Sequence, residues 1–142
     1  MENKEDFKKE YETANDFFKK KKFKEAIDLW MELASKGHSK SQYCIAYIHL
    51  YDGMGVKKNF EEAYKWTKLS AEQEEPEAMV LLAHMYDKGI GVTANKKEAF
   101  KYYLLSLKSG NTEAAEKVIY SYFYGIGVEI DYQKAKELCE IV

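Results

Sequence analysis

Gly89-Ile90-Gly91-Val92 decides the fold, because the same turn recurs as Gly53-Met54-Gly55-Val56 and as Gly125-Ile126-Gly127-Val128. Each copy begins 36 residues after the one before it. One alanine follows each turn at the same period, at Ala63, Ala99 and Ala135. A fixed period of this length indicates a repeat protein, in which similar small units stack on one another.

Each turn separates two stretches that have the apolar spacing of amphipathic helices. Before the second turn, for example, the apolar residues are Ala78, Leu81, Leu82, Met85 and Tyr86. The predicted first helices cover about Ser41–Tyr51, Glu77–Asp87 and Thr112–Tyr124. The predicted second helices cover about Phe60–Glu72, Lys96–Lys108 and Tyr132–Val142. Each repeat unit is therefore predicted to be helix, glycine turn, helix.

Local signals support this division. Asn59, Asn95 and Asp131 directly precede the second helices, where a side-chain oxygen can cap free N–H groups. The first glycine of each turn suits the left-handed residue that ends a helix. The second glycine lets the backbone turn back at close range. One extra residue within Ile45–Tyr51 predicts a local irregularity in the first turn.

The N-terminal segment is related but shorter. Two helices are predicted over about Asp6–Lys20 and Phe23–Lys36, and no Gly-x-Gly turn separates them. The distance from Ala14 to Ala26 is 12 residues, which matches the spacing of a tetratricopeptide hairpin.

The sequence therefore predicts an all-α fold, an α/α right-handed superhelical solenoid of about four helix-turn-helix repeats and eight helices. We expect a single domain over residues 1–142, with repeat units at about 6–37, 38–73, 74–109 and 110–142. The last helix is predicted to close the stack with a polar outer face. Its predicted inward stripe is Tyr132, Ala135, Leu138, Cys139 and Val142.

Two strings resemble the Sel-one-like repeat family, a relative of the tetratricopeptide repeat. They are Leu82-Ala83-His84-Met85-Tyr86-Asp87-Lys88-Gly89-Ile90-Gly91-Val92 and Asn95-Lys96-Lys97-Glu98-Ala99-Phe100-Lys101-Tyr102-Tyr103. The resemblance covers Ser39 to Val142 in three units. It implies an α/α solenoid that scaffolds protein complexes in signalling, secretion or host interaction. Secreted members linked to penicillin binding carry paired cysteines in each repeat. This chain lacks that pattern, so the activity is not implied for it.

Charge and composition narrow the possible partners. The net charge is −2, and all 22 basic residues are lysine. Arginine is the usual reader of phosphates and guanine edges, so its absence argues against a nucleic-acid partner, although a bias in genome composition gives the same pattern. The charged N-terminus and the lack of a long apolar run predict no signal peptide and no membrane insertion. Cys44 and Cys139 lie 95 positions apart with no local partner, so both are expected to be buried thiols of a cytoplasmic protein.

No pattern of residues indicates a catalytic site, a metal site or a cofactor. The three histidines, His38, His49 and His84, lack metal-binding spacing. A phosphate-binding glycine loop follows a strand, whereas each of these turns follows a predicted helix. We expect a protein that is not an enzyme.

The aromatic residues favour a binding role, because exposed tyrosine is enriched at interaction hot spots. In tetratricopeptide-type stacks the first helix of each pair lines the inner groove. Alignment on Ala14, Ala46, Ala83 and Ile119 predicts the groove residues Tyr11, Asn15, Phe18, Tyr43, Tyr47, Tyr51, His84, Asp87, Tyr120, Phe123 and Tyr124. The alternative for each residue is packing between neighbouring helices.

The resulting hypothesis is a scaffold or adaptor, expected to be a monomer, that binds a protein or peptide segment in its concave groove. A second hypothesis is a dedicated inhibitor of the immunity or antitoxin kind that blocks one enzyme or toxin. A third, a hydrolase with a site formed only in the tertiary structure, has no local motif to support it.

Overall fold

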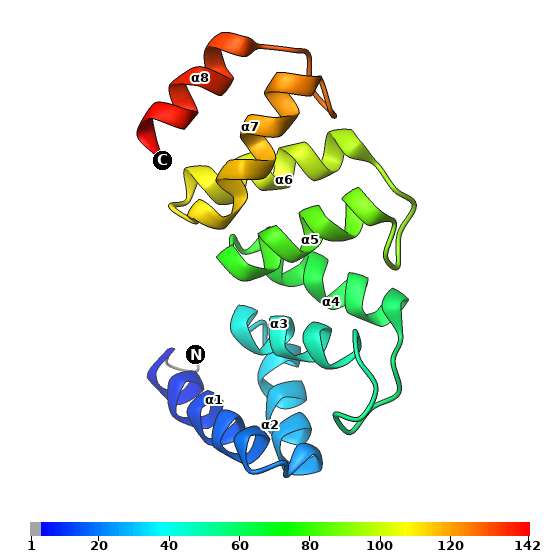
Figure 1. Cartoon of the computed structure of the whole chain (residues 1–142). Helices are drawn as coiled ribbons and strands as arrows, with labels where there is room; N and C mark the ends of the chain where they lie inside the picture. The colour runs from blue at the N-terminus through cyan, green and yellow to red at the C-terminus, as the bar shows by residue number, and fades with distance from the viewer. Residues whose placement is uncertain (1–3) are drawn as a thin grey trace. The chain divides into compact units, whose positions relative to one another are not determined.

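The computed structural model describes the backbone of residues 4–142 and the side chains of residues 7–142. Within this part all regular structure is helical, which confirms the all-α prediction. The α-helices are α1 (Lys4–Lys19), α2 (Phe23–Ser35), α3 (Ser39–Ile48), α4 (Phe60–Glu72), α5 (Pro76–Lys88), α6 (Lys96–Lys108), α7 (Ala115–Tyr124) and α8 (Tyr132–Ile141), with a 3-10 turn, η1 (Thr112–Ala114), before α7 (Figure 1).

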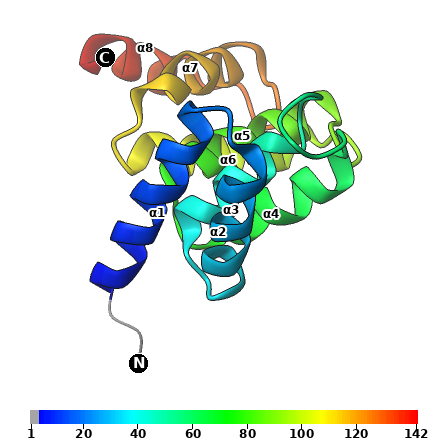
Figure 2. The same cartoon turned by 90° about the horizontal axis from the view of Figure 1, so that it is seen from below.

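The chain divides after Gln73 into two compact units. In the first unit α1 packs on α2, α2 on α3 and α3 on α4, and Figure 2 shows the first three of these helices side by side. In the second unit α5 packs on α6, α6 on α7 and α7 on α8. Contacts between successive helix-turn-helix elements are the mark of a solenoid. The right-handed superhelix and the boundaries of the repeat units stay predictions.

The capping residues act as the sequence predicts. The side-chain oxygens of Asn59 and Asn95 each accept a hydrogen bond, at 3.1 Å, from the backbone N–H three residues further on. Asp131 accepts the equivalent bond at 3.0 Å. Each bond satisfies a backbone donor that the first turn of a helix leaves free. The second helix of each glycine-turn repeat therefore starts at a fixed residue.

The ends of the first helices differ between repeats. Gly89 and Gly125 adopt φ angles of 71° and 70° and cap α5 and α7, as predicted. The same prediction is wrong for Gly53, because α3 already ends at Ile48 and its cap, His49, is right-handed. The backbone hydrogen bond from the Asn59 N–H to the His49 carbonyl spans ten positions of the chain. The corresponding bond in the next repeat, from the Asn95 N–H to the Tyr86 carbonyl, spans nine. The extra residue thus produces the expected irregularity.

The second glycine of the turn allows close packing on the preceding hairpin. A Cβ atom built on Gly55 would lie 2.8 Å from both Phe23 Cβ and Ile27 Cδ1 of α2. A Cβ on Gly127 would overlap the carbonyl group of Lys96 at the start of α6. Both glycines also have φ angles in the left-handed region, at 91° and 73°. Steric space and backbone conformation therefore both require glycine.

Small side chains form the centres of the two units. Ala26, Ala63, Ala99 and Ala135 recur in the second helices and are all buried. In the first unit a cluster forms around Ala14, Ala26, Trp30, Ala34, Ile45 and Ile48. In the second unit it forms around Ala83, Ala99, Tyr103, Ala114, Val118, Tyr122 and Ala135. Alanine at these positions lets neighbouring helices approach closely, and the aromatic rings fill the space beside them.

The packing of α8 differs from the prediction. Of its predicted inward stripe, only Ala135 is buried and Leu138 is half-buried. Tyr132 and Val142 are 61% and 56% exposed, and Cys139 is also exposed. The reason is geometric: within the described chain α8 packs mainly on α7, and one main neighbour covers a narrower stripe than the sequence pattern offers. The expectation that Cys139 is buried is therefore wrong, and Cys44 is half-buried.

We expect Gly127→Ala to destabilise the protein strongly, because the new methyl group would overlap the Lys96 carbonyl as well as strain the left-handed backbone. Gly110→Ala is the matched control, since Gly110 has a φ of 94° but no atom within 4 Å of its Cβ position. Backbone strain alone should cost about 1–2 kcal/mol in the control. The overlap should add roughly 1–3 kcal/mol in Gly127→Ala. Urea unfolding of both variants measures the difference, and equal losses would refute the packing role of Gly127.

Candidate functional site

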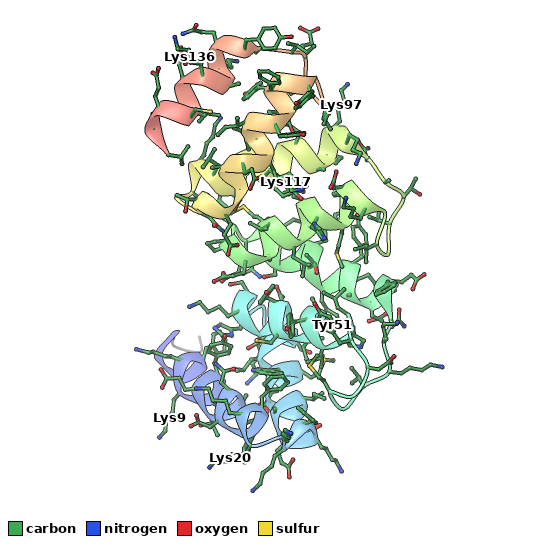
Figure 3. The ribbon with its side chains drawn as sticks, viewed as in Figure 1. Lys9, Lys20, Tyr51, Lys97, Lys117 and Lys136 are labelled. Carbon is green, nitrogen blue, oxygen red and sulfur yellow. The ribbon has the colours of Figure 1, made fainter. Side chains whose placement is uncertain are left out.

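A row of tyrosine rings marks the first unit. Tyr43 and Tyr47 lie four residues apart on α3, so they share one face of the helix. Tyr51 follows in the turn, and Figure 3 shows its position after the end of α3. The ring centroids are 6.4 Å apart for Tyr43 and Tyr47 and 5.2 Å apart for Tyr47 and Tyr51. Tyr47 is 40% and Tyr51 48% exposed, so the row offers aromatic surface to solvent.

An apolar cavity of about 280 Å³ adjoins this tyrosine row. It lies between α1 and α3 and has Trp30 of α2 in its wall. The other lining residues are Asn15, Phe18, Lys19, Tyr43, Cys44, Tyr47 and Ile48. The indole Nε1–H of Trp30 donates a hydrogen bond of 3.2 Å to Asn15 Oδ1, which fixes the ring at the cavity wall. We call this space the α1–α3 cavity.

The predicted residues of α1 shape this region. Tyr11 is half-buried, with its hydroxyl oxygen 3.8 Å from Cys44 Sγ and its ring edge-on to His38. Phe18 packs against Trp30 at a centroid distance of 5.2 Å and against Phe23 at 5.4 Å. The three predicted residues of α1 therefore serve mainly in packing between helices. The solvent-exposed members of the predicted set in this unit are Tyr47 and Tyr51.

The second unit carries its own aromatic cluster. Tyr120, Phe123 and Tyr124 on α7 are 54%, 48% and 54% exposed. The ring of Tyr124 lies 4.4 Å from that of Tyr120 and 4.9 Å from that of Phe123, and Phe123 also contacts Tyr132. A hydrogen bond with Tyr120 raises the pKa of Tyr124. This cluster is a second exposed surface that is rich in aromatic rings.

A polar cavity of about 350 Å³ lies beside this cluster, among α5, α6 and α7. Lys96 Nζ donates to Asp87 Oδ1 at 2.6 Å and to the Asp87 backbone carbonyl at 2.9 Å, which ties the end of α5 to the start of α6. Burial alone would raise the pKa of Asp87, but Lys96, helped by Lys88 and Lys117, holds that pKa below its usual range. Burial also raises the pKa of Tyr103, in the same cavity, to about 12.

The structure brings the predicted residues together in two groups. Tyr11, Asn15, Phe18, Tyr43, Tyr47 and Tyr51 surround the α1–α3 cavity or continue its edge. Asp87 and Tyr120 line the polar cavity, next to Phe123 and Tyr124, while His84 is exposed on α5. Lys117, Phe100 and Tyr103 also line the polar cavity and were not predicted from the sequence. Lys117 shares a helical face with Tyr120 and Tyr124, so spacing along α7 could have indicated it.

Other kinds of site find no support in the described residues. Among the side chains of residues 7–142, no cluster of three or more histidine, cysteine, aspartate or glutamate residues is arranged to hold a metal ion. None of the helices within residues 4–142 is both long and apolar enough to cross a membrane.

Paired helices joined by glycine turns, with exposed rings along the first helix of a pair, define an α/α repeat protein. The Sel1 repeat model matches residues 39–75, 76–111 and 113–141, so the chain belongs to the Sel1 repeat family. This confirms the resemblance found in the sequence. Proteins of this family generally mediate protein interactions and are typically not catalytic.

Solved structures show the same fold. The crystal structure of a Sel1 repeat protein from Oxalobacter formigenes is 30% identical, with a TM-score of 0.84 over 92% of this chain and 53% of that chain. The protective antigen c5321 of uropathogenic Escherichia coli, which displays an SLR fold, is 28% identical, with a TM-score of 0.88 over 94% of this chain and 29% of that chain. The chain thus spans about half the length of the first protein and about three-tenths the length of the second.

A more distant match is to the Helicobacter pylori cysteine rich protein B, which is 16% identical with a TM-score of 0.62 over 84% of both chains. This match supports the fold alone. No curated protein sequence matches the chain.

We expect Asp87→Asn to destabilise the protein by about 0.5–1 kcal/mol at neutral pH, because it weakens the bond to Lys96. The folded state lowers the pKa of Asp87, so its stabilising effect is complete above the unfolded-state pKa, at about pH 4, and is lost as the pH falls through the folded-state pKa. Unfolding by urea should therefore show a difference from the wild type that shrinks on acidification. Asp28→Asn, at an exposed position of α2, is the control. A difference that persisted in acid would contradict the ionic origin.

Proposed function

We propose that this protein is a scaffold or adaptor that binds a segment of another protein through the first-helix face of its repeats. The observation that carries this proposal is the row of Tyr43, Tyr47 and Tyr51 beside the α1–α3 cavity, in which Tyr47 and Tyr51 are exposed. The aromatic cluster of α7 is a second contact surface of the same chemistry. Family membership supports the general role, and the site supplies the specific surface.

The chemistry of this surface suits a polypeptide. Each tyrosine combines an apolar ring with a hydroxyl group that can donate or accept a hydrogen bond, so it binds side chains and backbone groups alike. The rings of Tyr43 and Tyr47 contact each other on α3, so little of their side-chain freedom remains to be lost on binding. The cavity next to them has walls of Phe18, Trp30 and Ile48 and accommodates one apolar side chain as an anchor.

The test compares two exposed aromatic residues of the first unit. Tyr47 is 40% exposed beside the α1–α3 cavity, and Phe60, at the start of α4, is 39% exposed and does not line it. Affinity purification from native cells, followed by mass spectrometry, identifies proteins retained by the wild type. We expect Tyr47→Ser to weaken binding of the true partner at least about thirtyfold, as for a hot-spot residue, and Phe60→Ser to leave it unchanged.

Calorimetry with the purified partner gives the affinities, and circular dichroism checks that both variants remain folded. If Tyr47→Ser and Tyr51→Ser, singly and together, bound every retained protein as tightly as the wild type, the tyrosine row would not be the binding surface.

A further inference from the structure

The turn between α1 and α2 concentrates positive charge that the fold leaves unneutralised. Five lysines occur within six residues, at Lys19, Lys20, Lys21, Lys22 and Lys24, and all are exposed. Figure 3 shows Lys20 projecting from this turn. None of the five forms an ion pair with a carboxylate among the side chains of residues 7–142. The chain as a whole has a net charge of −2, so this basic turn stands out against an acidic background.

The basic turn is also closed by backbone hydrogen bonds and strained at one residue. Its backbone is closed by two bonds of 2.9 Å, from Lys21 N–H to the Phe18 carbonyl and from Lys22 N–H to the Phe17 carbonyl. Lys21 adopts a φ of 59°, a left-handed conformation that helix ends usually assign to glycine. A lysine held there costs stability that a glycine would not. The strained backbone of this turn therefore carries an exposed positive charge.

The basic turn is continuous with the α1–α3 cavity. Lys19 belongs to both, since it lines the cavity and begins the lysine run. Phe18 lines the cavity and packs against Phe23, the first residue of α2 after the turn. An apolar cavity with a charged edge of one sign selects a ligand that has an apolar side chain next to charges of the opposite sign.

We propose that the first unit binds an acidic polypeptide segment, with one apolar side chain in the α1–α3 cavity and flanking aspartate or glutamate residues over the basic turn. This inference rests on the proposed function and names the chemistry of the partner. Lysine ammonium groups bind carboxylates as flexible point charges, and because they are exposed they contribute mainly long-range attraction, which salt screens. Affinity from the cavity and attraction from the turn therefore have different dependences on ionic strength.

Three blocked peptides separate these contributions: acetyl-Glu-Glu-Leu-Glu-Glu-amide, the same peptide with glutamine for every glutamate, and the same peptide with serine for leucine. Calorimetry on the full chain measures their affinities, and in a Trp66→Phe background the fluorescence of Trp30 in the cavity wall reports contact. We expect the first peptide to bind at least tenfold more tightly than either control. Its advantage over the glutamine peptide should fall as salt is raised.

Charge variants test the turn directly. Lys20→Gln/Lys22→Gln should weaken binding of the acidic peptide about fivefold or more. Lys97→Gln/Lys136→Gln removes the same charge from the second unit and should have little effect (Figure 3). Lys21→Gly should raise the midpoint of urea unfolding, because it relieves the strain of the left-handed backbone. The same variant should bind the acidic peptide more weakly, because it removes a positive charge. A gain in stability together with a loss of affinity is a result that a merely structural turn would not give.

The inference is overturned if the glutamine peptide binds as tightly as the acidic one, or if the Lys20→Gln/Lys22→Gln variant binds the acidic peptide like the wild type. It is also overturned if oligouridine of equal charge binds more tightly than the acidic peptide and is lost in the same variant, since the turn would then recognise RNA. A native partner that depends on Tyr47 but not on the lysines would sink this inference and leave the proposed function intact. If the acidic peptide bound in a lysine-dependent way but no cellular partner depended on Tyr47, the tyrosine row would lose its proposed role, and the preference of the basic turn for acidic ligands would stand.

Discussion

The close approach of two glycine turns, at Gly55 and at Gly127, to the hairpin that precedes each within its own unit is the constraint on which the structure depends. The backbone at Gly55 lies against Phe23 and Ile27 of α2, and the backbone at Gly127 lies against the first residue of α6. Neither position has room for a methyl group. Buried alanines at the helix crossings act in the same way, because they let one hairpin rest on the next. The tyrosine rows can remain at the surface because small residues form these contacts.

In the proposed function, binding and packing use the same helices but different residues. On α3, Ile45 and Ile48 are buried, whereas Tyr47 is open to solvent. On α7, Val118 and Tyr122 are buried, whereas Tyr120 and Tyr124 are open. On α3 and α7, one stripe therefore holds the core contacts, and the other stripe is the surface that we propose for a partner. Substitution of an exposed tyrosine can change recognition without removing a core contact.

The sequence predicted what depends on short-range rules. The capping residues Asn59 and Asn95 set the starts of α4 and α6, and both helices were predicted with the observed bounds. The aromatic face of α3 followed from helical spacing. The failures depend on tertiary packing. Gly53 does not cap α3, because one extra residue lets the helix end earlier. The exposure of Tyr132 on α8 depends on how many neighbours a helix has, which a periodic pattern does not encode. Lys117 and Tyr103 line the polar cavity because three helices meet there, which the pattern along any one helix does not show.

The early end of α3 has a consequence for the tyrosine row. Tyr43 and Tyr47 are held by helical hydrogen bonds, but Tyr51 lies on turn backbone. Its ring can change position through a few turn dihedral angles, while α3 keeps all its hydrogen bonds. One edge of the proposed recognition surface therefore lies on turn backbone, and the rest lies on a helix. Such a surface fits ligands that share an anchor but differ in the bulk of the residue that follows it.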